Sequence, residues 1–231
     1  MTLPSTEVIG VQSRRLFAGA LALLLPIALF GSLRQPVPQS THAVAAQALV
    51  LDRLVVAAVE RTHHSVRYDP AYVSIPYPGG DVPASTGVCT DEVIRAYRGV
   101  GIDLQKEVHE DMERHPSAYP LKWKYSSRGT HSLTDTNIDH RRVSNLMVFF
   151  SRRGQTLPLS RNPRDYRPGD LVTWNLGGGI THIGIVVNEK SLQSERYLIV
   201  HNIGAGPQME DVLFNWKIIG HYRYPGEDIR R

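Results

Sequence analysis

The spacing of the apolar residues changes once along this chain, and this change constrains the fold more than any other feature of the sequence. Up to about residue 154 these residues recur every three or four positions, which predicts helices. Beyond residue 170 they come in short runs separated by Gly, Asn and Ser, which predicts strands. Helices followed by consecutive short strands indicate an α+β domain with an antiparallel meander. The predicted helices cover residues 44–61, a segment from Cys89 to Gly99 or Gly101, and segments that follow Asp103 and Asp139. The predicted strands cover residues 170–174, 181–187, 197–201 and 218–222.

Residues that begin or end helices predict their boundaries. Asp103 and Asp139 are expected to cap the helices that follow them, because a short acidic side chain accepts hydrogen bonds from the free N–H groups of a first turn. Gly154 is expected to end the last helix. Residues 66–88 are rich in Pro, Gly and Tyr and predict an ordered loop.

The N-terminal segment predicts export. Residues 16–33 are almost wholly apolar and follow Arg14 and Arg15, which is the order of a signal segment. Residues 43–45, Ala-Val-Ala, favour cleavage, whereas an apolar stretch of about 18 residues also approaches the length of a spanning helix. The string Ser-Arg-Arg-Leu-Phe at residues 13–17 resembles a twin-arginine signal.

We therefore expect residues 1–45 to be a signal peptide or membrane anchor and residues 46–231 to form one periplasmic domain, acting as a monomer. The chain has 26 Lys and Arg and 22 Asp and Glu, and removing residues 1–45 takes away three Arg and one Glu, which leaves a net charge of +2. So small a charge excludes nucleic acid as an expected partner. The pairs Arg141-Arg142 and Arg152-Arg153 are expected on solvated helix faces.

Cys89 is the only cysteine of the chain, and the pattern places it in the first turn of a helix. A single cysteine excludes an intramolecular disulfide, the usual structural use of cysteine in an exported protein. The positive end of a helix macrodipole favours the thiolate, which is the nucleophilic form. Cys89 is therefore predicted to be a nucleophile, and a buried thiol acting as a small hydrophobe is the alternative.

Two histidines on the predicted strands can supply the base that a thiol nucleophile needs. Strand alternation places His182 and Gly184 on one face of their strand, and if this strand pairs with the next, His201 lies beside them. His182 has the pKa range to take the thiol proton and return it to a leaving amine. His201 could then fix the tautomer and orientation of His182, as a carboxylate does in other triads.

Four motifs follow one another in the region from about residue 68 to residue 224. They are Cys89 at a helix start, Gly169-Asp170-Leu171-Val172-Thr173-Trp174, His182-Ile183-Gly184-Ile185-Val186 and Val200-His201. Their order resembles that of the NlpC-type, papain-like cell-wall cysteine peptidases. The resemblance implies a papain-like fold with helices packed on a meander or half-barrel, and it implies a Cys89 nucleophile, a His182 base and a His201 orienting residue.

The resemblance also carries an oxyanion and substrate-binding site. A Tyr followed by Gly-Gly recurs in that family before the nucleophile, and Tyr77, in the string Tyr-Pro-Gly-Gly at residues 77–80, is its counterpart. Thr90 and Asp91 follow the nucleophile, where the peptidases usually have Ser-Gly. Tyr77, Thr90 and Asp91 are therefore expected at this site, together with the free N–H groups of the helix start.

Longer strings are more specific. They are residues 89–98 (CTDEVIRAYR), 108–112 (VHEDM), 137–142 (NIDHRR) and 200–204 (VHNIG). They resemble an uncharacterised bacterial family, domain of unknown function 1287, which is grouped with the same peptidases.

Other uses of these residues remain open. Cys89, His182 and His201 are also acceptable zinc ligands, although no paired C-x-x-C or H-x-x-x-H spacing supports a metal. A module that holds peptide stems without cutting them has the same residue types. His140, between two charged neighbours, is expected in a surface cluster that caps a helix, with a place in the cleft as the alternative.

Taken together, these features predict an exported cysteine hydrolase that needs no cofactor. It is expected to cleave an amide bond in peptidoglycan or another peptide or amide substrate, through an acyl-enzyme thioester. Endopeptidase, amidase and transferase activities all fit the predicted residues.

Overall fold

The chain has the α+β fold that the spacing of its apolar residues predicts. The structure is a computed structural model that describes residues 39–120, 125–127 and 130–226, all within one compact unit of the chain, 37–231. The predicted signal or anchor segment at 16–33 lies outside the described residues. Among the helices of the described part, none is both long and apolar enough to cross a membrane.

The helices lie in the first two thirds of the chain. The α-helices are α1 (Gln39–Arg61), α2 (Cys89–Gly99), α3 (Leu104–Arg114) and α4 (Val143–Arg153), and the 3-10 helices are η1 (Pro116–Ala118), η2 (Asp139–Arg141) and η3 (Pro163–Asp165). α2 begins and ends as predicted. α1 begins before the predicted residue 44, so the domain boundary expected after residue 45 falls within a continuous helix.

A six-stranded sheet has the order β5-β10-β6-β7-β8-β9. Its strands are β5 (Gln155–Thr156), β6 (Asp170–Asn175), β7 (Thr181–Lys190), β8 (Tyr197–Asn202), β9 (Pro207–Glu210) and β10 (Lys217–Arg223). The predicted strands β6, β7 and β8 form an antiparallel meander, and β9, which was not predicted, continues it. The predicted fourth strand, β10, does not follow β8 but returns to pair with β6. Two small pairs lie apart from this sheet: β1 (Arg67–Tyr68) with β2 (Thr86–Gly87), and β3 (Tyr125–Ser127) with β4 (Thr130–Ser132).

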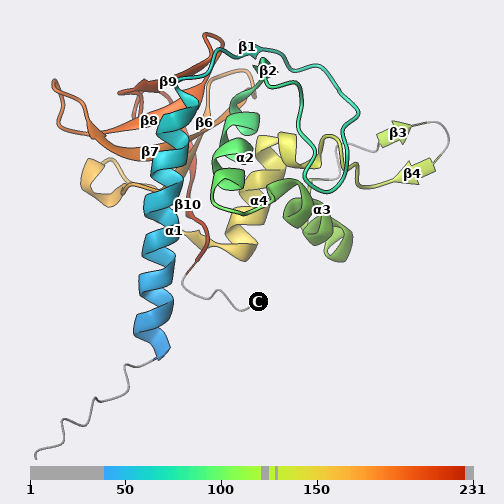
Figure 1. Cartoon of the computed structure of the whole chain (residues 1–231), viewed down its shortest axis with the longest axis horizontal. Helices are drawn as coiled ribbons and strands as arrows, with labels where there is room; N and C mark the ends of the chain where they lie inside the picture. The colour runs from blue at the N-terminus through green and yellow to red at the C-terminus, as the bar shows by residue number, and fades with distance from the viewer. Residues whose placement is uncertain (1–38, 121–124, 128–129, 227–231) are drawn as a thin grey trace, which may run out of the picture. The chain divides into compact units, whose positions relative to one another are not determined.

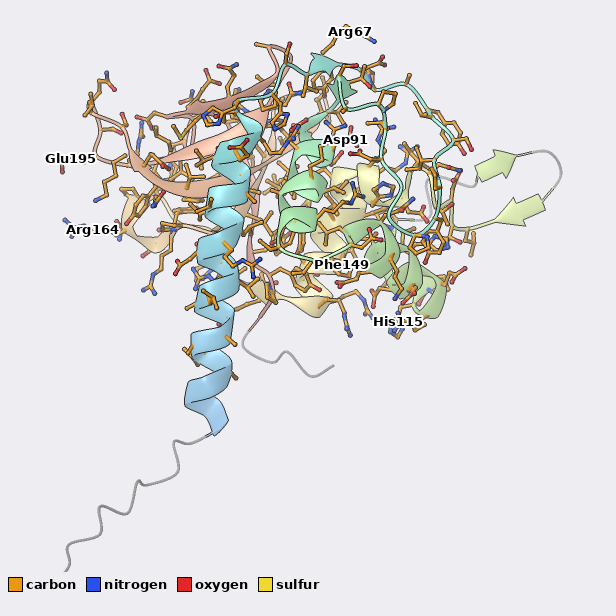
Figure 2. The ribbon with its side chains drawn as sticks, viewed as in Figure 1. Arg67, Asp91, His115, Phe149, Arg164 and Glu195 are labelled. Atoms are coloured by element: carbon orange, nitrogen blue, oxygen red, sulfur yellow. The ribbon has the colours of Figure 1, made fainter. Side chains whose placement is uncertain are left out.

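The two faces of the sheet are buried against different groups of side chains. α1, α2 and α4 all contact β7, and Figure 1 shows α1 running alongside α2. The core between helices and sheet contains Val93 and Phe149, the latter labelled in Figure 2, together with Ile183 of β7. On the other face, Trp174 and Val186 belong to a second cluster. Strand alternation therefore sends neighbouring residues of β7 into two different cores.

The predicted N-cap is confirmed for α3 and is wrong for α4. The Asp103 side chain accepts a hydrogen bond from the Gln105 N–H and caps α3, as predicted. The prediction for Asp139 is wrong, because Asp139 begins η2 and the N-cap of α4 is Arg142. The Asp139 carboxylate instead bonds to His109, which lies on α3. Gly154 ends α4 as predicted.

Candidate active site

The start of α2 is held by a buried carboxylate. Asp91 accepts a hydrogen bond from the Val88 N–H at 2.7 Å, which is one half of a capping box. Arg141 donates to both carboxylate oxygens of Asp91, at 2.8 and 3.0 Å. Thr90 donates its hydroxyl to the Arg141 carbonyl at 3.1 Å. Figure 2 shows Asp91 at this end of α2, below the loop that carries Arg67.

These contacts correct three predictions. Arg141 is 7% exposed and forms an ion pair with Asp91, so it does not lie on a solvated helix face. Thr90 and Asp91 are 1% and 2% exposed, and their polar atoms are engaged by Arg141 and by the helix start. Their side chains fix the geometry around Cys89 and are not free to bind a substrate.

The Cys89 thiol lies between the start of α2 and the start of β7. Backbone N–H groups of Ile183, Thr90 and Cys89 itself act on the sulfur and lower its pKa. Burial outweighs them and raises the pKa of Cys89 to about 12. Cys89 is 4% exposed, so the expectation of a thiolate favoured by the helix dipole is wrong for this structure.

The two predicted histidines are brought together. His182 Nε2 and His201 Nδ1 lie 2.8 Å apart and share a hydrogen bond between β7 and β8. Both side chains lie in the interior, where burial lowers the pKa of each, that of His182 to about 3. His182 is therefore a neutral imidazole at pH 7. Its second nitrogen, Nδ1, has no hydrogen-bond partner within the described part of the chain and is not fully buried.

His182 is the residue next to Ile183, whose N–H acts on the sulfur. The thiol and the imidazole are thus neighbours through one peptide unit of β7. The described residues show no hydrogen bond between Cys89 and His182. Cys89 packs in the core on the Ile183 face of β7, whereas His182 lies on the other face, against the rings of Trp174 and Trp216. Catalytic hydrogen bonds are often long or misaligned in unliganded enzymes and tighten when the substrate binds.

Gly184 makes the histidine pair possible. Val186 pairs with Ile199 and Ile185 with Val200, so His201 lies opposite Gly184 rather than opposite His182. A Cβ atom at residue 184 would lie 2.6 Å from Ile199 Cγ2 and 3.2 Å from His201 Cβ. The absent side chain leaves the space across which the His201 ring reaches diagonally to His182.

Replacing Gly184 with Ala is therefore expected to lower the free energy of unfolding by about 1–3 kcal/mol and to displace His201, because the new methyl group overpacks this site. Urea denaturation would measure the first effect. Adding Ile199→Ala, which removes the nearest atom, should recover part of the loss in the double variant. Equal stability of Gly184→Ala and wild type would contradict the close approach.

One carboxylate beyond the predicted residues joins the site. Glu210 Oε2, on β9, lies 2.9 Å from His201 Nε2. No sequence pattern predicts this contact, because β9 is four residues long and begins with Pro207, which strand patterns disfavour. The pairing of β9 with β8 creates it.

A different tyrosine from the predicted one lies near the thiol. Tyr77 packs edge-on against His109, with ring centres 5.2 Å apart, and the charges that act on its hydroxyl belong to α3 and its cap. Tyr68 instead interacts electrostatically with Cys89 and Asp91, which with burial raise its pKa. β1 pairs Tyr68 with Gly87, two residues before Cys89. The Gly-Gly pattern did not indicate Tyr68, and a role for Tyr77 at an oxyanion site stays a prediction.

His140 lies in neither of the predicted positions. It is 2% exposed, so its cluster with Asp139 and Arg141 is not on the surface. Burial lowers the pKa of His140 to about 3, and Nδ1 has no partner within the described residues. Asp139 connects this cluster to His109 rather than to Cys89.

A groove of about 510 Å³ opens between the loop after α1 and the turn after β8. Its walls are the loop after α1, with His63 and Arg67, and the turn between β8 and β9, with Gly204 and Gln208. Gln208 is the partner of His201 in the β8–β9 register, so the groove reaches the strand neighbour of His201, although none of Cys89, His182 and His201 lines it. His63 is exposed. Within the described residues, no group of three or more His, Cys, Asp and Glu side chains is arranged to hold a metal ion.

The alkylation rate of Cys89 should report its burial. At pH 8.5 a free thiol is about half ionised, whereas a thiol with a pKa of about 12 is ionised in less than about one molecule in a thousand. Iodoacetamide should therefore label the native protein far more slowly than the urea-denatured protein, with a rate that rises as the pH is raised above 9. Mass spectrometry of timed samples measures both rates, and rapid native labelling at pH 7 would contradict the raised pKa.

Two comparisons with known proteins complete the description. The profile of a family described as domain of unknown function (DUF1287) matches residues 55–224. The uncharacterized protein YijF of Escherichia coli (strain K12) is 55% identical over 157 residues, which make up 68% of this chain and 73% of that protein. The family match includes the Cys89 helix start and the two histidine strands, and neither description names an activity.

Proposed function

The chain belongs to the family of domain of unknown function 1287, and from the geometry of its site we propose that it is a cysteine hydrolase that cleaves amide bonds. The observation that carries the proposal is the His182–His201 hydrogen bond beside a helix that begins with the only cysteine. A thiol and a neutral imidazole that neighbour each other through one peptide unit are the groups that nucleophilic catalysis uses, and the proposal requires their side chains to meet when a substrate binds. The proposal includes a papain-like fold of the NlpC type, which the order of the motifs supports.

The first step forms a tetrahedral intermediate. The Cys89 sulfur attacks the carbonyl carbon of the substrate while its proton passes to Nδ1 of His182. Because the resting pair is neutral, proton transfer accompanies the attack and no ion pair precedes it. The negative oxygen that develops would be stabilised by the N–H groups of Cys89 and Thr90 and by the Tyr68 hydroxyl.

The second half of the reaction restores the enzyme. His182 gives its proton to the leaving amine, the carbon–nitrogen bond breaks, and a thioester to Cys89 remains. A water molecule then attacks the thioester while His182 takes one of its protons. The proton returns to the sulfur as the carbon–sulfur bond breaks, and the products are a carboxylic acid and the free thiol.

The substrate class rests on resemblance and compartment. The NlpC-type peptidases cut cell-wall peptides, and residues 1–45 read as an export signal or anchor. We therefore propose peptidoglycan peptides as the substrate and the periplasm as the place of action. The polar groove that reaches the strand neighbour of His201 has room for an extended peptide.

The direct test is product analysis. Purified protein is incubated with intact peptidoglycan and with defined muropeptides, and the products are identified by mass spectrometry. A new pair of fragments whose masses sum to that of the substrate plus one water supports hydrolysis, and the position of the cut separates an endopeptidase from an amidase. A product joined to an added amine would identify a transferase. Activity lost on dialysis against EDTA would favour a metal enzyme instead.

One observation favours a second candidate, a module that binds cell-wall peptides without cutting them. Cys89 is 4% exposed and its thiol is held neutral by burial, as a structural cysteine would be. Such a module would retain muropeptides in a pull-down and release no fragments. The absence of products together with micromolar binding would therefore replace the hydrolase with this candidate.

A further inference from the structure

The hydrogen bond between His182 and His201 is continued by a second one, from His201 to the Glu210 carboxylate. We infer that Glu210 is a positioning residue that sets the tautomers of His201 and His182 and so keeps Nδ1 of His182 free of its proton. This inference deepens the proposed function, since the free nitrogen is the one that would take the thiol proton. It is carried by two hydrogen bonds in series, 2.9 Å from Glu210 to His201 and 2.8 Å from His201 to His182.

Only one arrangement of protons satisfies both hydrogen bonds of the series Glu210–His201–His182. An ionised carboxylate only accepts, so His201 must donate from Nε2 to Glu210. A neutral imidazole carries one N–H, so Nδ1 of His201 is then an acceptor. His182 must therefore donate from Nε2, which leaves Nδ1 of His182 with a lone pair. The Glu210 carboxylate, at one end of this series of hydrogen bonds, therefore determines that Nδ1 of His182, at the other end, is the basic nitrogen.

Without the carboxylate, the opposite arrangement satisfies the His201–His182 bond equally well. His201 could carry its proton on Nδ1 and donate to Nε2 of His182. His182 would then hold its proton on Nδ1 and could not accept one from Cys89. A triad histidine in the wrong tautomer loses most of its activity, which is why an orienting acceptor matters.

The described part of the chain offers His201 no competing acceptor for this role. His182 faces it from β7 and Glu210 from β9, and the Trp216 ring lies 6.3 Å from its centre. Burial lowers the pKa of His201, and the Glu210 carboxylate partly opposes this effect. Among the described residues, Glu210 is the only charged group that acts on this pKa. The His201 side chain is fully buried, whereas that of Glu210 is 46% exposed on the edge strand. Solvent therefore weakens the contact at the Glu210 end, and its effect should be moderate.

The decisive measurement is the tautomer of each ring, read from long-range proton–nitrogen NMR spectra of the full chain labelled with ¹⁵N-histidine at pH 7. We expect His182 and His201 both to carry the proton on Nε2 in the wild type. In Glu210→Ala a second set of signals, with the proton on Nδ1 of His182, should appear. Glu210→Gln keeps an acceptor oxygen and should largely preserve the wild-type tautomers, but protonation of His201 should move to lower pH because the carboxylate no longer favours the imidazolium.

Glu189→Gln is the matched control, because it removes a carboxylate from the far end of β7. Its spectrum should be that of the wild type. Unchanged tautomers in Glu210→Ala, or a wild-type His182 that carries its proton on Nδ1, would overturn the inference. Thermal unfolding of each variant shows whether the edge strand is intact.

A kinetic arm separates this inference from the proposed function. If the protein hydrolyses muropeptides, Glu210→Ala should lower kcat about 10-fold with little change in KM, and Glu210→Gln should lie between it and the wild type. If no hydrolysis is found, the proposed function fails while the NMR result still decides the role of Glu210. Hydrolysis with equal kcat in Glu210→Ala and wild type would overturn the inference alone.

Discussion

Replacing Cys89 with Ser is expected to lower kcat by roughly 10⁴-fold or more, because an alcohol beside a neutral imidazole is a far weaker nucleophile than a thiol. The side chains differ by one atom, and the position is almost fully buried at the start of α2. The change should therefore leave the fold and the affinity for cell-wall peptides nearly intact. Muropeptide turnover by mass spectrometry measures the first effect, and a binding isotherm measures the second.

The same pair of measurements discriminates the two candidate functions. A binding module would lose nothing in Cys89→Ser, since its thiol takes part in no reaction. Equal turnover by Cys89→Ser and wild type on every fragment tested would therefore remove the cysteine hydrolase from consideration. Thermal unfolding serves as the control, because in a strongly destabilised variant a loss of turnover could come from unfolding and not from loss of the nucleophile.

Replacing His182 with Ala is expected to lower kcat by about 10²–10⁴-fold, the usual contribution of a general base. His201→Ala should cost less, because His201 orients the base and does not touch the substrate. His201→Asn or Gln should retain some activity, since a polar side chain can still meet Nε2 of His182. Initial rates on one defined muropeptide are sufficient to rank these variants.

Asn202 provides the control for this series. It follows His201 in β8, and its side-chain oxygen accepts the Gly204 N–H in the turn. Because alternation turns it away from His182, Asn202→Ala should change the rate by no more than a few fold. If Asn202→Ala were the more damaging change, His201 would not be the orienting residue. His182→Gln, a larger polar replacement, guards against misfolding of His182→Ala beside Trp174 and Trp216.

Local patterns determined most of the fold. The capping carboxylate of Asp103, the terminating Gly154 and the periodic apolar residues of α1, α2 and α4 depend only on neighbours within a few positions, so a sequence contains their causes. The meander followed from alternation within β6, β7 and β8. The same alternation predicted that His182 and His201 share a face, and they form a hydrogen bond. The short strands β5 and β9 have too few residues to carry such a pattern.

The chemistry of the site depended on contacts between segments that are far apart in the chain. The helix position of Cys89 predicted a low pKa for its thiol, but the depth at which α2 packs against β7 raises it to about 12, because desolvation outweighs the N–H groups nearby. Arg141 and Asp91, fifty positions apart, form a buried ion pair that local charge patterns placed in solvent. Tyr68 and Glu210 reach the site only through the pairing of β1 with β2 and of β9 with β8. Residue types and spacing therefore identified the reacting groups, whereas their protonation and their partners were decided by burial and strand pairing, which act through space and not along the sequence.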